Sequence, residues 1–222
     1  MTETSNASDE ARTGDSSGAE LLPRPVVAIF GLYGAGAEQV ARAVATALHV
    51  PFHHQSFSSA VLEGGHPDLA TADEATFLRK MVSVLAATFG GGATLDDATE
   101  QIRQDLIARN RRSVAECERL GGVVIGRNAA HLLAHRPRTL HVLLTGSAAD
   151  RIARAAEQTN ISYEHAARRA DREDEVRADM AMALYGWDPR RPEHYDLVAN
   201  TSRVPIPAVV AAIVAAVRAM PG

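Results

Sequence analysis

The sequence has almost no cysteine and almost no lysine: Cys117 and Lys80 are the only residues of their types among 222. One cysteine cannot form an internal disulfide or supply a Cys-rich metal site, which fits a reducing compartment, and we expect the cytoplasm. Since 22 arginines accompany the single lysine, we expect any phosphate chemistry to depend on arginine side chains and backbone amides.

Long apolar runs are also missing. The longest, Val204 to Val217, has two prolines near its start and is shorter than the ~20 residues of a membrane span, so we expect no membrane segment. Residues 1–20 are acidic and rich in Ser, Thr and Gly, without the basic start and apolar run of a signal peptide. We predict that residues 1–24 form a disordered tail.

A strong charge of one sign is absent as well. The net charge is −4, and residues 25–222 hold 22 acidic against 21 basic side chains. This balance argues against nucleic-acid binding, which requires a basic surface. With 46% apolar and 23% charged residues, the composition is that of a chain that folds around a core.

Four short runs of mostly apolar residues predict buried strands, at 26–30, 123–125, 140–144 and 196–199. Apolar residues at helical spacing follow them, most clearly over 206–217, and also over 38–48 after the first strand. The alternation predicts an α/β fold in which helices cover both faces of a parallel sheet, in a single domain over 25–222.

Residues 56–118 show helical patterns without a strand, which predicts a helical insertion. An apolar stripe over 77–88 ends at three glycines, and a more polar helix is predicted from Asp96 to Arg119. A further polar helix, from Ile161 to about Leu184, carries arginines among acidic residues.

The first strand runs into a glycine loop, Gly31-Leu-Tyr-Gly-Ala-Gly36, directly before a helix. Backbone amides of such a loop, together with the helix N-terminus, can hold a phosphate. However, Ala37 and Glu38 replace the lysine and Ser/Thr of a Walker loop, and the third glycine of a dinucleotide fingerprint is missing. A turn that only lets the helix pack on the strand is the alternative. The candidate phosphate-binding residues are Gly31, Tyr33, Gly34, Ala35, Gly36, Ala37 and Glu38.

A second candidate site residue, Arg127, follows the strand at 123–125. We expect it at the carboxyl edge of the sheet, where open α/β folds bind ligands. An arginine there can hold a phosphate or a carboxylate through two hydrogen bonds. The alternative is a solvated loop arginine.

Five motifs occur in a specific order: Tyr33–Gly36, Ile125–Ala129, His141–Arg151, Asp171–Arg177 and Tyr195–Ser202. Each is modest alone. As an ordered set, they resemble the cytidylate kinase-like family of P-loop nucleoside monophosphate kinases, over about residues 26–218.

The resemblance implies a P-loop NTPase-type sheet with a helical acceptor-binding region (56–118) and a lid (160–179). It implies ATP with Mg²⁺ as cofactors and a nucleoside monophosphate, CMP or dCMP first, as the substrate. By position in the motifs, Arg127 matches the acceptor-side arginine and Arg151 opens the helix before the lid. Arg172 and Arg177 match lid arginines that Asp174 would orient. The metal ligands and the oligomeric state stay unassigned.

Several alternatives remain open. The lid segment could be an exposed helix with i,i+4 pairs such as Arg169 and Glu173. The chain could also be a nucleotide-binding regulatory protein that has lost turnover, or a kinase of another small metabolite. Departures from the family pattern motivate the regulatory protein. Glu38 would repel phosphates unless it turns away or meets a metal, and His53-His54 replace an expected Asp.

Overall fold

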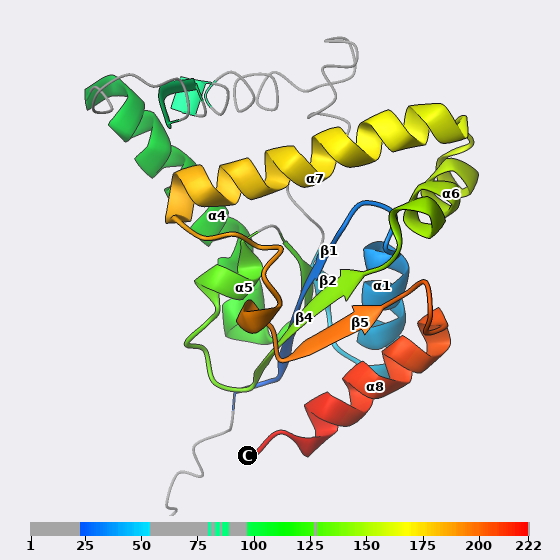
Figure 1. Ribbon diagram of the computed structural model, residues 1–222. Coiled ribbons are helices and arrows are strands. Elements are labelled where there is room, and N and C mark those ends of the chain that lie inside the picture. The colour runs from blue at the N-terminus through cyan, green and yellow to red at the C-terminus, as the bar shows by residue number, and fades with distance from the viewer. Residues whose placement is uncertain are drawn as a thin grey trace, which may run out of the picture.

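The structure is a computed structural model that describes residues 23–53, 80, 83–84, 86–88, 97–126 and 128–221. The elements, labelled as in Figure 1, are β1 (Val26–Gly31), α1 (Ala37–Leu48), β2 (Phe52–His53), α4 (Asp97–Leu120), β3 (Gly122–Ile125), α5 (Ala129–Leu132), β4 (Thr139–Thr145), α6 (Ala148–Thr159), α7 (Tyr163–Tyr185), a 3₁₀ turn (Pro192–His194), β5 (Leu197–Asn200) and α8 (Ile206–Ala219).

All four predicted strands are present. The structure also contains the helix predicted after the first strand and those predicted over 96–119, from 161 and over 206–217. The strand at 52–53 adds a fifth. Residues 1–22 of the predicted tail, and most of the predicted insertion between 56 and 96, lie outside the described residues. The predicted apolar stripe over 77–88 is described only in part. Its described residues are helical, at 80, 83–84 and 86–88.

The five strands form one sheet in the order β2-β3-β1-β4-β5, and every pair is parallel. β1 lies at the centre, with Val27 beside Val123 of β3 on one side and Leu140 of β4 on the other. A central parallel strand is covered on both faces, which explains why 26–30 is a continuous apolar run. The predicted α/β fold is confirmed.

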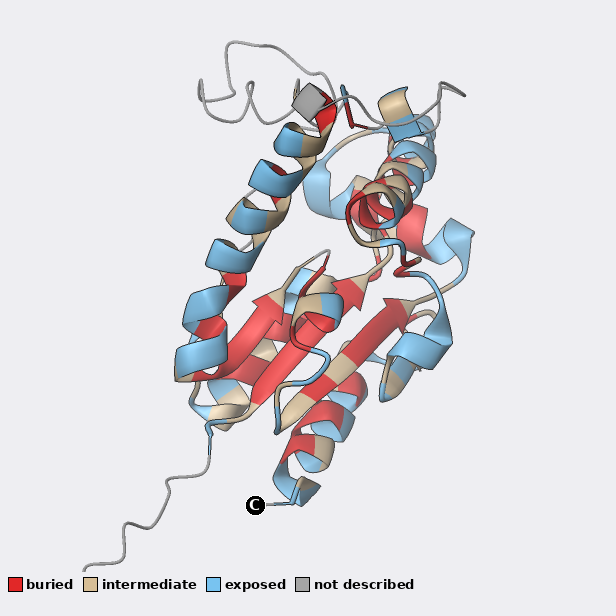
Figure 2. Cartoon of the chain, turned by 90° about the vertical axis from the view of Figure 1, so that its left-hand side faces the viewer, coloured by how far each residue is buried: buried red, intermediate tan, exposed pale blue. Residues whose placement is uncertain are grey.

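Helices cover both faces of the sheet, because alternate side chains of a strand point to opposite faces. Val27 and Ile29 of β1 pack with α1 and α8. Val26 and Ala28 pack with α4 and α5, where Cys117 of α4 is fully buried. Figure 2 shows the strands largely buried between these two layers.

The two helices α6 and α7 lie at the carboxyl ends of the strands, and α7 crosses above the sheet in Figure 1. Side-chain N-caps set where each begins: Ser147 accepts from the Asp150 amide, and Ser162 accepts from the His165 amide. Tyr33, in the loop after β1, packs between them in a cluster with Ile152 and Ala166. None of the helices within the described residues is both long and apolar enough to cross a membrane.

Candidate functional site

The loop between β1 and α1 needs its glycines. Gly34 and Gly36 have φ angles of 72° and 82°, in the left-handed region that favours glycine. A Cβ on Gly34 would also lie 2.0 Å from the carbonyl oxygen of Arg151 in α6. The Ala35 amide donates to the Leu32 carbonyl at 2.9 Å and closes the turn. The sequence therefore brings the loop backbone into direct contact with α6.

The N-terminus of α1 opens on a cavity. Its N-cap, Gly36, provides no side-chain hydrogen bond to the first amides of the helix. A helix start without a cap has backbone N–H groups and a positive dipole end that favour an anion. The cavity has a volume of about 430 Å³ and continues from this helix start to the carboxyl ends of the strands, where Phe52, Ile125 and Gly126 line it.

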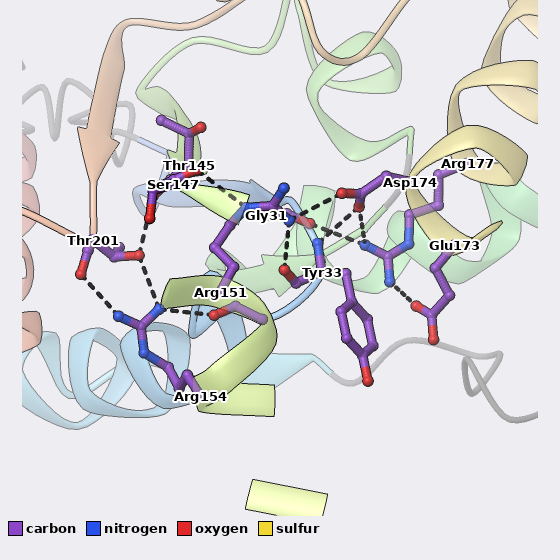
Figure 3. A network of polar contacts seen from close by, with 12 residues as sticks. Gly31, Tyr33, Thr145, Ser147, Arg151, Arg154, Glu173, Asp174, Arg177 and Thr201 are labelled. Carbon is purple, nitrogen blue, oxygen red and sulfur yellow. Dashed lines mark hydrogen bonds and ion pairs between the residues drawn. The ribbon is translucent and has the colours of Figure 1, made fainter. Parts of the chain in front are cut away.

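Three arginines bind the carbonyl oxygens of the loop (Figure 3). Arg177 donates to the Gly31 carbonyl at 3.1 Å, Arg151 to that of Tyr33 at 2.6 Å, and Arg154 to that of Gly34 at 2.7 Å. In a trans peptide the C=O and the next N–H point in opposite directions. By fixing these carbonyls, the guanidinium groups therefore fix the orientation of the following amides.

Asp174 of α7 binds the same loop. The Tyr33 amide donates to its carboxylate at 2.8 Å, and Arg151 donates to its other oxygen at 3.0 Å. Arg177 lies 3.5 Å from the first oxygen. A carboxylate of the predicted lid thus contacts one amide of the phosphate-loop candidate and two of the predicted site arginines.

Glu173, the neighbour of Asp174, is 1% exposed and binds Arg169 at 3.0 Å and also Arg177. The Arg169 guanidinium lies 5.6 Å from the centre of the Tyr33 ring. The predicted pair of Arg169 and Glu173 exists, but Glu173 and Arg177 are buried. An exposed helix with surface ion pairs is therefore the wrong description of this face of α7.

The predicted arginines are not all brought together. Arg151 is 8% exposed and lies behind the loop, where it also donates to the Gly146 carbonyl. Arg177 lines the cavity, whereas Arg172 points to solvent and forms no hydrogen bond or ion pair within the part of the chain described. Arg127 lies outside the described residues, although its neighbour Gly126 lines the cavity.

Glu38, which departs from the family pattern, lines the cavity at the start of α1, and its side chain is 64% exposed. It accepts a 2.7 Å bond from Arg42, one turn later. The Arg42 guanidinium in turn lies 5.0 Å from the centre of the Phe52 ring. A cation therefore already accompanies the carboxylate at the start of α1.

Arg154 and Thr201 are site residues that the sequence reasoning missed. Arg154 donates to the Thr201 carbonyl at 2.9 Å and to its hydroxyl at 3.1 Å, and that hydroxyl donates to the Thr145 carbonyl at 3.0 Å. The sequence feature that could have identified Arg154 is its spacing, because a residue three positions after Arg151 lies on the same face of α6. Hydrogen bonds from Ser147 and Ser202 lower the pKa of Asp150 beside them.

A built metal site does not appear in the described part of the chain, since no group of three or more His, Cys, Asp or Glu side chains there could hold an ion. His53, a metal-ligand or base candidate on residue type alone, lies with its Nε2 3.0 Å from the Gly121 carbonyl.

Comparison with known proteins agrees with this geometry. A sequence model of the cytidylate kinase-like family matches residues 26–203. The chain therefore belongs to the cytidylate kinase-like family, as its motifs predict. It is similar to a cytidylate kinase of Ignicoccus hospitalis, with 30% identity over 154 residues, which are 63% of this chain and 90% of that protein.

Two further similarities are more limited. The chain is 37% identical over 106 residues to a uronate isomerase of Corynebacterium glutamicum, but these are 48% of this chain and span only 20% of that protein's length. The crystal structure of an uncharacterized protein from Eubacterium ventriosum matches with a TM-score of 0.60 and 17% identity, over 88% of this chain and 98% of the other. That structure shares the fold.

Proposed function

We propose that the protein transfers the γ-phosphoryl group of ATP to a nucleoside monophosphate, with CMP and dCMP as the first candidates. The junction of β1 and α1 carries the proposal. There, a glycine loop with two left-handed residues precedes an uncapped helix start, and both line a cavity of about 430 Å³. Membership of the cytidylate kinase-like family supports the substrate class.

On this proposal, the donor phosphates lie against the backbone amides of residues 31–38, and Arg169 and Arg177 line the cavity beside them. Phosphoryl transfer asks a protein mainly for positioning and for positive charge over the phosphate oxygens. Mg²⁺ would arrive with ATP and supply further charge. Of the amides that follow the arginine-bound carbonyls, those of Leu32 and Ala35 already donate to the carbonyls of Leu144 and Leu32, so the amides that face the phosphates would be those of Gly34 and the first turn of α1.

The acceptor would bind at the carboxyl ends of β2 and β3, where Phe52, Ile125 and Gly126 line the cavity. Arg127, the next residue in the chain, would hold the acceptor phosphate through two charge-assisted hydrogen bonds. Arg151, Arg172 and Arg177 would neutralise charge that develops during transfer. Arg172 would reach the phosphates only if α7 shifts, because it points to solvent here.

A nucleotide-binding regulatory protein without turnover is the second candidate. Two observations favour it: Ala37 stands where a Walker loop has lysine, and Asp174 already occupies the Tyr33 amide. A kinase of another small metabolite would use the same loop with a different acceptor. ATP binding is common to all three functions, so the acceptor and the turnover distinguish them.

The decisive experiment measures ATP binding by calorimetry beside coupled ADP release with CMP, dCMP, UMP, AMP and GMP. We expect ATP binding and release of ADP that requires a pyrimidine monophosphate. Arg127→Ala should raise the KM for that monophosphate at least tenfold and change ATP affinity less than twofold, whereas the exposed Arg218→Ala of α8 should change neither.

The other outcomes are equally informative. ATP binding without ADP release from any monophosphate would reject the kinase and select the regulatory protein. ADP release only with a different phosphate acceptor would select the metabolite kinase. Absence of ATP binding would reject all three.

A further inference from the structure

Asp174 has the hydrogen-bond partners that a phosphate oxygen would have. Its carboxylate accepts from the Tyr33 amide at 2.8 Å and from Arg151 at 3.0 Å, with Arg177 at 3.5 Å. One loop amide and two guanidinium groups form a donor set that suits an anion of either kind. In this structure the anion is a carboxylate of the same chain.

The neighbouring carboxylate shows that α7 does not need Asp174 to balance its own arginines. Glu173 binds Arg169 at 3.0 Å and also Arg177, and both pairs lie within α7. Asp174 instead bonds outward, to Tyr33, 141 positions earlier in the chain, and to Arg151 of α6. Its distinctive role is to connect α7 with the loop.

Asp174 and a donor phosphate are expected to exclude each other from this loop. Two anions within hydrogen-bond distance of the same amide repel strongly, because little solvent separates them. The Arg151 side chain, at 10% exposed, is largely removed from water. A phosphate that reaches the Tyr33 amide must therefore displace the carboxylate.

We propose that Asp174 is an internal anion that latches α7 onto the phosphate loop of the ligand-free protein, and that the polyphosphate of the nucleotide displaces it. This rests on the proposed function, since it takes the loop as the phosphate site. Displacement frees Arg177, which lines the cavity, from the carboxylate, so that it can turn to phosphate oxygens, while Arg151 keeps its bonds to the Tyr33 and Gly146 carbonyls. Nucleotide binding and the position of α7 are thereby coupled through one side chain.

The test compares Asp174→Asn with Glu175→Gln. Both remove one negative charge from α7, but Glu175 is exposed and makes no hydrogen bond or ion pair among the described residues. The probe is inorganic tripolyphosphate without Mg²⁺, followed by calorimetry, so that neither turnover nor an acceptor is needed. We expect Asp174→Asn to bind tripolyphosphate about tenfold more tightly than wild type, and Glu175→Gln to stay within twofold.

A second measurement does not depend on ligand. Hydrogen exchange of the Tyr33 amide should become at least tenfold faster in Asp174→Ala, which deletes the acceptor, and stay unchanged in Glu175→Ala, because the bond to the carboxylate protects the amide. Asp174→Glu keeps the charge and should bind tripolyphosphate within threefold of wild type, which covers the case in which the neutral variant folds poorly.

Each result decides one proposal. Equal or weaker tripolyphosphate binding by Asp174→Asn would overturn the latch and mean that Asp174 supports phosphate binding by holding the arginines. A tenfold gain in Asp174→Glu, which keeps the negative charge, would overturn the latch as well. Unchanged exchange at Tyr33 in Asp174→Ala would overturn it too. If exchange accelerates but no form of the protein binds tripolyphosphate, then the loop is not the phosphate site, and the proposed function fails together with the displacement step.

Discussion

Arg154 and Gly34 are joined by a 2.7 Å hydrogen bond from the guanidinium to the backbone carbonyl, across 120 positions of sequence. The same guanidinium binds Thr201 in the turn after β5. One side chain thus ties the loop after β1 to the turn after β5, while Arg151, one helical turn earlier, holds the adjacent carbonyl of Tyr33. The amides of the loop are therefore oriented from α6.

Arg154→Ala is expected to remove the hydrogen bonds that connect the loop after β1 with the turn after β5. Loss of hydrogen bonds to a charged group should lower the free energy of unfolding by about 2 kcal/mol and weaken ATP binding several-fold, because the Gly34–Ala35 peptide then keeps only the bond from the Ala35 amide to the Leu32 carbonyl. Urea unfolding and calorimetry measure both. Arg218→Ala, an exposed change on α8, is the control. Unaltered ATP affinity in a destabilised Arg154→Ala would mean that Arg154 supports the fold and not the loop.

Gly34→Ala and Gly186→Ala form a matched pair. Both glycines have positive φ, 72° and 70°. A Cβ at 186 meets nothing within 4 Å, whereas one at 34 would lie 2.0 Å from the Arg151 carbonyl oxygen. Gly186→Ala should therefore cost only the backbone strain of about 1–2 kcal/mol and keep ATP binding. Gly34→Ala should abolish ATP binding, because either the loop or α6 must move to make room for the Cβ. Equal ATP affinities in the two variants would refute this prediction.

The layers of the fold were predictable because they depend on local patterns. Residues 26–30 are apolar throughout, since β1 is central and covered on both faces. The loop was predictable because only glycine adopts φ near 80° easily, and glycines stand at both such positions. β2 was not visible as an apolar run, because a strand of two residues is too short to show a pattern.

The arginine contacts could not be predicted, because their partners are backbone carbonyls far away in sequence. Arg177 reaches Gly31 across 146 positions, and no residue type marks a carbonyl as an acceptor. The family motif includes Asp171–Arg177 as a whole, and it does not distinguish Arg172 from Arg177. Helical geometry does so, since residues five apart on a helix point in different directions.

Arg172→Ala and Arg177→Ala should separate stability from turnover. Arg177→Ala leaves Glu173 as a buried charge with one partner fewer and should destabilise the fold by about 3 kcal/mol. Arg172→Ala should change stability by less than about 0.5 kcal/mol, because the side chain is exposed. If Arg172 reaches the phosphates during turnover, kcat falls at least tenfold in this stable variant while KM changes little. A wild-type kcat would remove Arg172 from the site.

The buried thiol of Cys117 predicts a dependence of stability on alkaline pH. Burial raises its pKa from the ordinary 9.0 to about 11. Above pH 9 the unfolded chain therefore loses a proton that the folded chain keeps, and stability falls as pH rises toward 11, by up to about 1.4 kcal/mol per pH unit. Urea unfolding of wild type and Cys117→Ala at pH 8 and 10.5 tests this. The variant should lose less stability between the two values, and identical losses would show that the thiol ionises equally in both states.

Glu38→Gln tests whether the departure from the family pattern impairs phosphate binding. The carboxylate is bound to Arg42 at 2.7 Å, so the substitution removes one partner of that cation as well as deleting a negative charge. We expect ATP to bind about threefold more tightly at low salt, with a smaller gain at 0.5 M salt, because these groups are exposed and screened. Glu116→Gln, an exposed change on α4, is the control for net charge.

Repeating the Glu38→Gln titration with and without Mg²⁺ separates the two roles that the sequence leaves open. Since Arg42 already neutralises Glu38, the gain should appear under both conditions. If the carboxylate instead holds Mg²⁺ through water, the substitution would weaken binding of Mg²⁺-ATP and spare metal-free ATP. An unchanged affinity in both titrations would mean that the phosphates do not approach the start of α1, and the loop would then lose its assignment as the donor site.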